Sequence, residues 1–240
     1  MPASVSTVSF GNTKQAKDDL FQGGAEDSGI VLLDVLRNDL GGNAKSLYAV
    51  DNGTSTGGDR PVDLLVQDAA LAEEVSALGA RIWITADGKV AYDTASPALQ
   101  FIGNGQSVSD SFTYAIRLGN GTLSWASVTV TVTGTNDVPV IGGVSTASVT
   151  EDASTPNLSA SGALTIADVD QNQSSFVAQS GTAGSNGYGS FTVDAAGNWT
   201  YAADNSQAAI QQLGVGQSLT DSFTVVSQDG SASRVVTVTI

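Results

Sequence analysis

The sequence predicts an all-β protein made of two copies of one antiparallel β-sandwich module. The first observation is a segment of residues 105–113 that recurs, nearly unchanged, as residues 216–224. The second is the alternation of Val with Ser or Thr, which is clearest over residues 124–133 and 234–240. Period-two alternation of β-branched residues is typical of half-buried strands, and a long internal repeat indicates a duplicated fold.

Further matches occur in the same order in both halves of the chain. They pair residues 26–27 with 151–152, 84–92 with 193–201, and 128–132 with 236–240. The order of the matches divides the chain into three parts. We expect an N-terminal segment over residues 1–17, a first module over residues 18–137 and a second module over residues 138–240.

Turn residues separate the predicted strands at intervals that suit hairpins. Asn120-Gly121 is the strongest hairpin signal, and Asp87-Gly88 and Ala196-Gly197 mark two more. Strands are also expected at residues 112–116 and 223–227, which alternate in the same way. Several short strands per ~100 residues, separated by Gly and Asn turns, indicate an antiparallel sandwich.

Helix is expected at few places. Over residues 63–78, apolar side chains recur at helical spacing, namely Leu64, Leu71, Val75 and Leu78. The second module has no counterpart, so the sequence predicts a helical insertion in the first module. Short helical turns are expected at residues 96–99, with Pro at the first helical position, and at 206–213, ended by Gly214.

Composition excludes several kinds of chemistry. The chain has 9 basic and 24 acidic side chains, no His and no Cys, with a formal charge of −15. Without His and Cys there is no Ser-His-Asp or Cys-His nucleophile, no zinc site built from these ligands and no disulfide. Oxygen ligands remain, and they suit calcium or magnesium. The negative charge argues against nucleic acid as a partner.

The sequence also bears on location. No run of about 18 apolar residues is present, so we expect no membrane insertion. The N-terminal residues lack the basic region and apolar run of a cleaved secretory signal. We expect a monomer.

Aspartate outnumbers glutamate 20 to 4, and the acids gather at recurring positions. Asp suits turns and oxygen cages, and calcium takes six to eight oxygens. No single segment supplies that many, so ligands would have to converge from a strand end, a linker and a neighbouring module. The candidate metal ligands are Glu26, Asp27, Asp110, Asn136, Asp137, Glu151, Asp152, Asp168, Asp170 and Asp221.

Each acid also has a structural explanation, because Asp caps turns without a metal. Asp110 and Asp221 occupy the same repeat position and could each cap a loop instead. Paired carboxylates could also serve a glycosidase. Since the pairs fall at duplicated positions, they favour architecture over a unique active site, and we expect no enzymatic activity.

Aromatic residues give a weaker functional signal. Trp199 and Tyr201 alternate along one predicted strand, so we expect both in the core. Trp125 and Tyr188 are weak candidates for contact with a sugar, and the carbohydrate site is otherwise unknown from the sequence.

The segment 134–139, Gly-Thr-Asn-Asp-Val-Pro, resembles the signature that joins tandem cadherin-like modules in bacterial secreted adhesins, including VCBS-type repeats. The second module is similar to that repeat over nearly its whole length, through residues 162–170, 189–193, 197–201 and 219–224. The first module is similar but diverged, with Asn38-Asp39 in place of Asp-x-Asp. Two such modules and little else resemble the Rhizobium-adhering (Rap) proteins.

The resemblance implies two tandem cadherin-like, immunoglobulin-like sandwiches that bind calcium. It implies Asn136 and Asp137 as linker ligands, Asp168 and Asp170 as paired strand-end ligands, and Glu26 as the first-strand acid. It further implies a secreted lectin, exported by type I secretion without a cleaved signal, that binds acidic exopolysaccharide or capsular polysaccharide and shapes biofilm matrix. The alternative is a calcium-stiffened structural repeat with no glycan site of its own.

Overall fold

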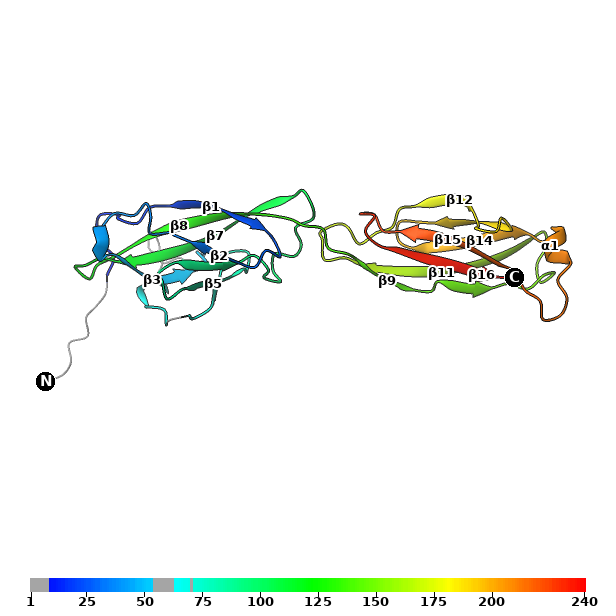
Figure 1. Ribbon diagram of the computed structural model, residues 1–240, viewed down its shortest axis with the longest axis horizontal. Coiled ribbons are helices and arrows are strands. Elements are labelled where there is room, and N and C mark those ends of the chain that lie inside the picture. Colours follow the sequence, from blue (N-terminus) through cyan, green and yellow to red (C-terminus); the bar gives the residue numbers. More distant parts are fainter. Residues whose placement is uncertain (1–8, 54–62, 70) are drawn as a thin grey trace. The chain divides into compact units, whose positions relative to one another are not determined.

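The computed structural model describes residues 9–53, 63–69 and 71–240, and its placement of strands is shown in Figure 1. The chain divides into two compact units. Unit 1 ends at Asn136 and unit 2 comprises Asp137–Ile240. Within each unit, two β-sheets supply the apolar side chains of one core, so the predicted all-β sandwich class is confirmed.

The described residues of unit 1 form two four-stranded sheets. One has the order β1 (Asp19–Ala25), β8 (Leu123–Thr133), β7 (Ser107–Arg117) and β3 (Ser46–Asp51). The other has the order β2 (Ile30–Leu33), β6 (Val90–Asp93), β5 (Arg81–Ile84) and β4 (Glu74–Val75). The predicted hairpin turns at Asn120-Gly121 and Asp87-Gly88 join β7 to β8 and β5 to β6.

Unit 2 contains a five-stranded and a three-stranded sheet. The larger has the order β12 (Gln179–Ala183), β13 (Gly189–Val193), β14 (Asn198–Asp204), β11 (Asn157–Ala167) and β9 (Val140–Gly143). The smaller has the order β10 (Thr146–Ser148), β16 (Ser233–Thr239) and β15 (Thr220–Val226). The predicted turn at Ala196-Gly197 joins β13 to β14.

Both units depart from antiparallel pairing in the same way. An early strand pairs in parallel with the last strand of its unit, β1 with β8 and β10 with β16. Residue alternation along a strand reports which face is buried but not the direction of the neighbouring strand, so the sequence could not distinguish these pairs. As a result, each early strand ends at the end of its unit where the last strand ends.

Aromatic side chains at duplicated positions fill the two cores. Trp199 and Tyr201 are buried in unit 2, as predicted from their alternation along one strand. Their repeat counterparts in unit 1, Val90 and Tyr92, are buried as well. Burying large apolar side chains supplies most of the driving force for folding. The duplicated sequence therefore encodes a duplicated core.

The predicted helix over residues 63–78 is wrong. The described part of this segment has only a 3-10 turn, Asp63–Leu65, followed later by the short strand β4. Of the apolar residues at helical spacing only Leu64 is buried, and Leu71 has a left-handed φ of 63°. Instead, β4 in this segment pairs with β5, so part of the segment with helical spacing of apolar residues forms a strand.

The other two helical turns are nearer to expectation. Residues 206–213 contain the helix α1, Ala208–Gln211, and residues 96–99 form a turn in which Leu99 donates to the carbonyl of Ser96 at 2.9 Å. A 3-10 turn also occurs at Gly42–Ala44.

The predicted N-terminal segment is only partly described, because residues 1–8 lie outside the described part. Phe10 bridges in parallel to Leu123, and Ala16 is buried in the unit 1 core. Residues 10–16 therefore pack against unit 1. Among the described residues, no helix has the length and apolar character needed to cross a bilayer.

Candidate metal centre

The linker between the units begins at Gly134, directly after β8. Its amide donates to the carbonyl of Gln106 at 3.0 Å, and a Cβ added at this position would lie 1.9 Å from the carbonyl oxygen of Ile102. A carbon atom and an oxygen atom that are not bonded cannot approach so closely unless the backbone is displaced. The first residue of the Gly-Thr-Asn-Asp motif is therefore glycine because the chain passes close to residue 102.

We expect Gly134→Ala to lower the free energy of unfolding by about 1–3 kcal/mol, because the added methyl group would overlap the backbone at Ile102. Gly11→Ala is the matched control, since its nearest neighbouring atom lies 3.6 Å from the added Cβ. Urea unfolding of both variants checks the prediction. Equal midpoints would show that the backbone at residue 102 yields without cost.

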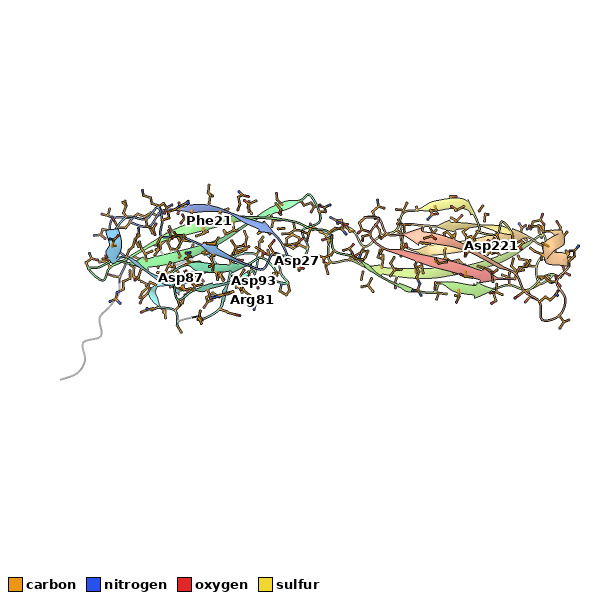
Figure 2. The ribbon with its side chains drawn as sticks, viewed as in Figure 1. Phe21, Asp27, Arg81, Asp87, Asp93 and Asp221 are labelled. Atoms are coloured by element: carbon orange, nitrogen blue, oxygen red, sulfur yellow. The ribbon has the colours of Figure 1, made fainter. Side chains whose placement is uncertain are left out.

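Glu26 and Asp27 directly follow β1. Figure 2 shows Asp27 at the end of unit 1 that leads to the linker. Glu26 is only 1% exposed, and its Oε1 accepts the N–H of Thr135 at 2.9 Å. Asp27 has a left-handed φ of 64°, and its Oδ2 accepts from the Thr135 hydroxyl at 3.4 Å. Both acids thus lie beside the start of the linker, where the predicted ligand Asn136 is exposed.

Unit 2 places the predicted Asp-x-Asp pair directly after β11. Asp170 is 2% exposed, and its Oδ2 accepts the N–H of Asp137 at 3.0 Å. Oδ1 of Asp168 accepts the N–H of Asp170, also at 3.0 Å. One carboxylate oxygen of Asp137 lies within 4.8 Å of one of Asp170. Three of the predicted ligands are therefore together within unit 2.

Two oxygens of this pair are buried, and among the described residues neither has a hydrogen-bond donor: Oδ2 of Asp168 and Oδ1 of Asp170. Burial raises the pKa of Asp168, and the negative charges of Asp170 and Asp229 raise it further. A buried carboxylate oxygen without a donor carries an uncompensated desolvation cost. A bound cation would compensate that cost, so the pair has the properties of a cation site.

Asp229 is a charge at this site that the sequence analysis missed. It lies in the turn between β15 and β16, and the neighbouring Gln228 donates its N–H to the carbonyl of Ser175 at 2.9 Å. That contact fixes the turn next to the loop that follows Asp170. In the sequence, Asp229-Gly230 indicated only a turn, and only the fold places it near Asp168.

Glu151 and Asp152 follow β10, as Glu26 and Asp27 follow β1, but they lie far from the Asp168 pair. Asp152 has a φ of 59°, and its Oδ1 accepts from Asn205 Nδ2 at 2.7 Å. That hydrogen bond lowers the pKa of Asp152. Asn205 follows β14 opposite the start of β11, whereas Asp168 follows the end of β11, and the eleven residues of β11 span about 35 Å.

The two acids at the far end differ in their hydrogen bonding. The carboxylate of Asp152 has donors on Asn205 and Gln211, whereas Oε2 of Glu151 is buried with no donor among the described residues. Neither belongs to the group formed by Asp137, Asp168 and Asp170. The sequence therefore correctly predicted that Glu151 and Asp152 follow a strand. It did not identify the end of unit 2 at which they lie.

Asp110 and Asp221 anchor loops, which is the alternative that the sequence left open for them. Oδ1 of Asp221 accepts the N–H of Asn186 at 2.9 Å, and Oδ2 accepts the N–H of Gly189 at 2.9 Å and the hydroxyl of Tyr201 at 3.3 Å. The side chain is fully buried between the strands of unit 2 (Figure 2). The N–H of Ser222 also donates to Oδ1 at 3.2 Å, so each oxygen of Asp221 accepts two hydrogen bonds and none of its lone pairs is left for a metal.

Asp110 repeats this arrangement in unit 1. Its carboxylate accepts the hydroxyl of Tyr92 at 2.7 Å, the N–H of Leu78 at 2.9 Å and the hydroxyl of Ser76. Tyr92 and Tyr201 are repeat counterparts, so each module has a buried tyrosine-aspartate pair that fixes a loop. We therefore leave Asp110 and Asp221 out of the candidate metal centre.

Neither weak carbohydrate candidate is freely exposed. Trp125 is half-buried against a small cluster that includes Phe10 and Leu123, and the ammonium of Lys14 lies 5.4 Å from its ring centroid. Tyr188 is half-buried against the unit 2 core. Both rings are partly buried by packing, and the contacts of the described residues do not identify a sugar site at Trp125 or at Tyr188.

Comparison with known proteins agrees with this architecture. Residues 136–240 match the family model of the bacterial cadherin-like domain. Among solved structures, the protocadherin gammaB7 EC3-6 cis-dimer structure matches with a TM-score of 0.50 and 11% identity, over 95% of this chain and 46% of that chain. Mouse cadherin-23 EC22-24 matches with a TM-score of 0.43 and 11% identity, over 94% and 63%.

At 11% identity the protocadherin match shows the fold alone. This chain spans less than two thirds of the length of either structure. No curated protein sequence matches the chain. The resemblance of the whole layout to Rap proteins stays a prediction.

Proposed function

Since the chain consists of cadherin-like repeats, we propose that it is an extracellular adhesion module whose linker binds calcium. The observation that carries the proposal is the pair of buried oxygens on Asp168 and Asp170 that lack a donor within the described residues. Cadherin-like domains are adhesion modules, and we propose no catalytic role for this chain.

Calcium fits the available ligands better than other metals. The chain has no His and no Cys, so a soft or borderline metal has no preferred ligand. Carboxylate and carbonyl oxygens suit hard cations, and calcium tolerates the irregular geometry of ligands drawn from loops. Magnesium demands near-octahedral geometry and gives up its waters reluctantly, so it makes a poorer match.

Each end of the linker is bound to a buried acid of its own unit, and the end in unit 2 belongs to the proposed calcium site. The N–H of Thr135 donates to Glu26 in unit 1, and the N–H of Asp137 donates to Asp170 in unit 2. Only Asn136 separates these two linker residues. We propose that Asp137, Asp168 and Asp170, all in unit 2, supply calcium ligands, so that ion binding converts mutual repulsion of their carboxylates into attraction.

We further propose that the adhesion partner is an acidic exopolysaccharide or capsular polysaccharide of a bacterial matrix. A chain with a formal charge of −15 repels a polyanion, so direct binding is unfavourable. Calcium removes part of that charge, and an ion with open coordination positions could bridge to uronate groups of the polymer. This bridging requires free calcium around the protein, and a calcium-rich extracellular medium would supply it.

Calorimetric titration of the full chain tests the proposed function. We expect saturable binding of calcium, with magnesium binding more weakly, and co-sedimentation with a uronate-rich polysaccharide only in the presence of calcium. Absence of calcium binding would contradict the metal site. Calcium binding without any polysaccharide binding would support a structural repeat that stiffens and presents no glycan site, and polysaccharide binding in chelator would exclude a bridging ion.

A further inference from the structure

Unit 1 contains a separate group of buried oxygens around the hydroxyl of Tyr114, on β7. This hydroxyl lies near four oxygen atoms: the carbonyl oxygen of Lys17 at 2.9 Å, Oδ1 of Asp39 at 2.9 Å, Oδ2 of Asp19 at 3.1 Å and the carbonyl oxygen of Val35 at 3.2 Å. Tyr114 is fully buried, and Asp19 and Asp39 are 5% and 7% exposed.

Hydrogen bonding within the protein cannot satisfy this group. A phenol hydroxyl has one proton, so it can donate to one neighbour, and carbonyls and ionised carboxylates donate nothing. Three of the four contacts of Tyr114 then bring acceptor against acceptor. In addition, Oδ2 of Asp39 is buried and has no hydrogen-bond partner among the described residues. A bound cation would compensate these oxygens, and a proton retained by one carboxylate is the competing explanation.

We propose that this group is a second cation site, which takes a calcium ion on Asp19, Asp39 and Tyr114. The carboxylate oxygens named above, both oxygens of Asp39 included, the phenol oxygen and the two carbonyl oxygens make six donors. Calcium takes six to eight oxygens and accepts carbonyl and bidentate carboxylate ligands.

The electrostatics of the group support a cation. Burial raises the pKa of Asp19 to about 6, and the negative charge of Asp39 contributes to the rise. Burial also raises the pKa of Asp39. Each raised pKa reports a carboxylate whose charged form is disfavoured in the folded protein. A divalent cation would stabilise both charges at once.

Three basic side chains act on this group without satisfying it. The charge of Arg37 lowers the pKa of Asp19, and the charges of Lys45 and Lys17 lower that of Asp39. The ammonium of Lys45 donates to the main-chain carbonyl of Asp39 and not to its carboxylate. These charges weaken the attraction for a cation, so we expect this site to bind calcium less tightly than the linker.

The site is particular to unit 1. The N–H of Lys17 donates to Asp39 at 2.7 Å, as the N–H of Asp137 donates to Asp170 in unit 2. The repeat alignment, however, places Val225 opposite Tyr114, so unit 2 has no phenol oxygen at this position. The two units therefore share the backbone contact to an aspartate, but the oxygen atoms around that aspartate differ between unit 1 and unit 2.

Calcium stoichiometry of the full chain tests the proposal, measured by calorimetry in variants that remove one donor. We expect Tyr114→Phe and Asp39→Asn each to lose one equivalent of bound calcium, and terbium bound to the chain to lose emission excited through tyrosine. Tyr92→Phe is the matched control, because it removes a buried hydroxyl that binds Asp110 at 2.7 Å. It should keep the full stoichiometry.

The combined variant Asp168→Asn/Asp170→Asn separates this site from the linker. It should lose the linker ion and keep the one at Tyr114, so failure of either site is seen independently. Circular dichroism confirms folding, and Tyr114→Phe decides the matter if Asp39→Asn does not fold. Unchanged calcium stoichiometry in Tyr114→Phe would overturn the proposal. The proposal would also be overturned if the stability of Asp168→Asn/Asp170→Asn responded to pH but not to calcium, because that result would indicate a proton shared by the oxygens around Tyr114.

Discussion

Asp221→Ala should destabilise the protein by about 4 kcal/mol, because several buried donors would lose their acceptor together. The N–H groups of Asn186 and Gly189 both donate to this carboxylate at 2.9 Å, and so does the hydroxyl of Tyr201. Hydrogen bonds to charged groups contribute about 1.5–3 kcal/mol each, and stranded buried donors add a desolvation cost. Urea unfolding of the variant measures the loss.

The loop around Asp221 cannot close over the gap that the substitution leaves. A Cβ at Gly184 would lie 2.1 Å from the carboxylate, so the chain already wraps the side chain as closely as glycine allows. The near-isosteric Asp221→Asn should also destabilise, because its amide group would face a donor where Asp221 presents an oxygen. Asp194→Ala is the control, since its donors on the exposed 194–198 turn can turn to water.

The same variant decides whether Asp221 is a loop anchor or a calcium ligand. A loop anchor should cost equal stability in calcium and in chelator, because the ion does not touch it. A calcium ligand would lose more stability in calcium. If the effect of Asp221→Ala shrinks when the ion is removed, the assignment of Asp221 to the loop is wrong.

The sequence predicted the architecture well because the repeats carry the pattern of the fold. Alternation of Trp199 and Tyr201 correctly placed both in the core, and the Gly-containing turns marked the hairpins. The failure at residues 63–78 has a plain cause. Helical spacing of a few apolar residues in a short segment does not require that they share one buried face, and only Leu64 is buried.

The candidate metal centre was predictable only in part. Strand-end acids such as Asp168 and Asp170 could be found from spacing, since two residues along a strand project to one side. Spacing could not show that loop donors saturate Asp110 and Asp221, because the donors named above, apart from Ser222, come from residues 18 to 35 positions away. Nor could it place Asp229 beside Asp168, or Asp19 beside Tyr114.

Calcium should stabilise the protein in a way that depends on Asp168 and Asp170. At 100 times its dissociation constant, a ligand that binds only the folded state adds about 2.7 kcal/mol, which corresponds to a rise in Tm of about 5–10 °C for a chain of this size. In Asp168→Asn/Asp170→Asn we expect most of that rise to disappear. Thermal unfolding in calcium and in chelator measures both values.

The ion-free form gives the sharper part of this prediction. The pKa of Asp168 is raised above its ordinary value of 3.8 in the folded state, first by burial and also by the charge of Asp170. The folded protein therefore binds more protons than the unfolded one as pH rises above 3.8, so ionisation of Asp168 lowers stability. Asparagine removes that charge. In chelator, Asp168→Asn should equal or exceed the wild type in stability.

The order of stability of the wild type and Asp168→Asn should therefore invert with the ion. We expect the wild type to be the more stable protein in calcium. In chelator, we expect Asp168→Asn to be at least as stable as the wild type. Asp194→Asn is the matched control, because Asp194 has its pKa lowered by the side chain of Asn198 and lies on an exposed turn. It should lose slightly in both conditions and keep the full calcium effect. If Asp168→Asn is less stable than the wild type by the same amount with and without calcium, the Asp168 carboxylate holds the fold together and binds no ion.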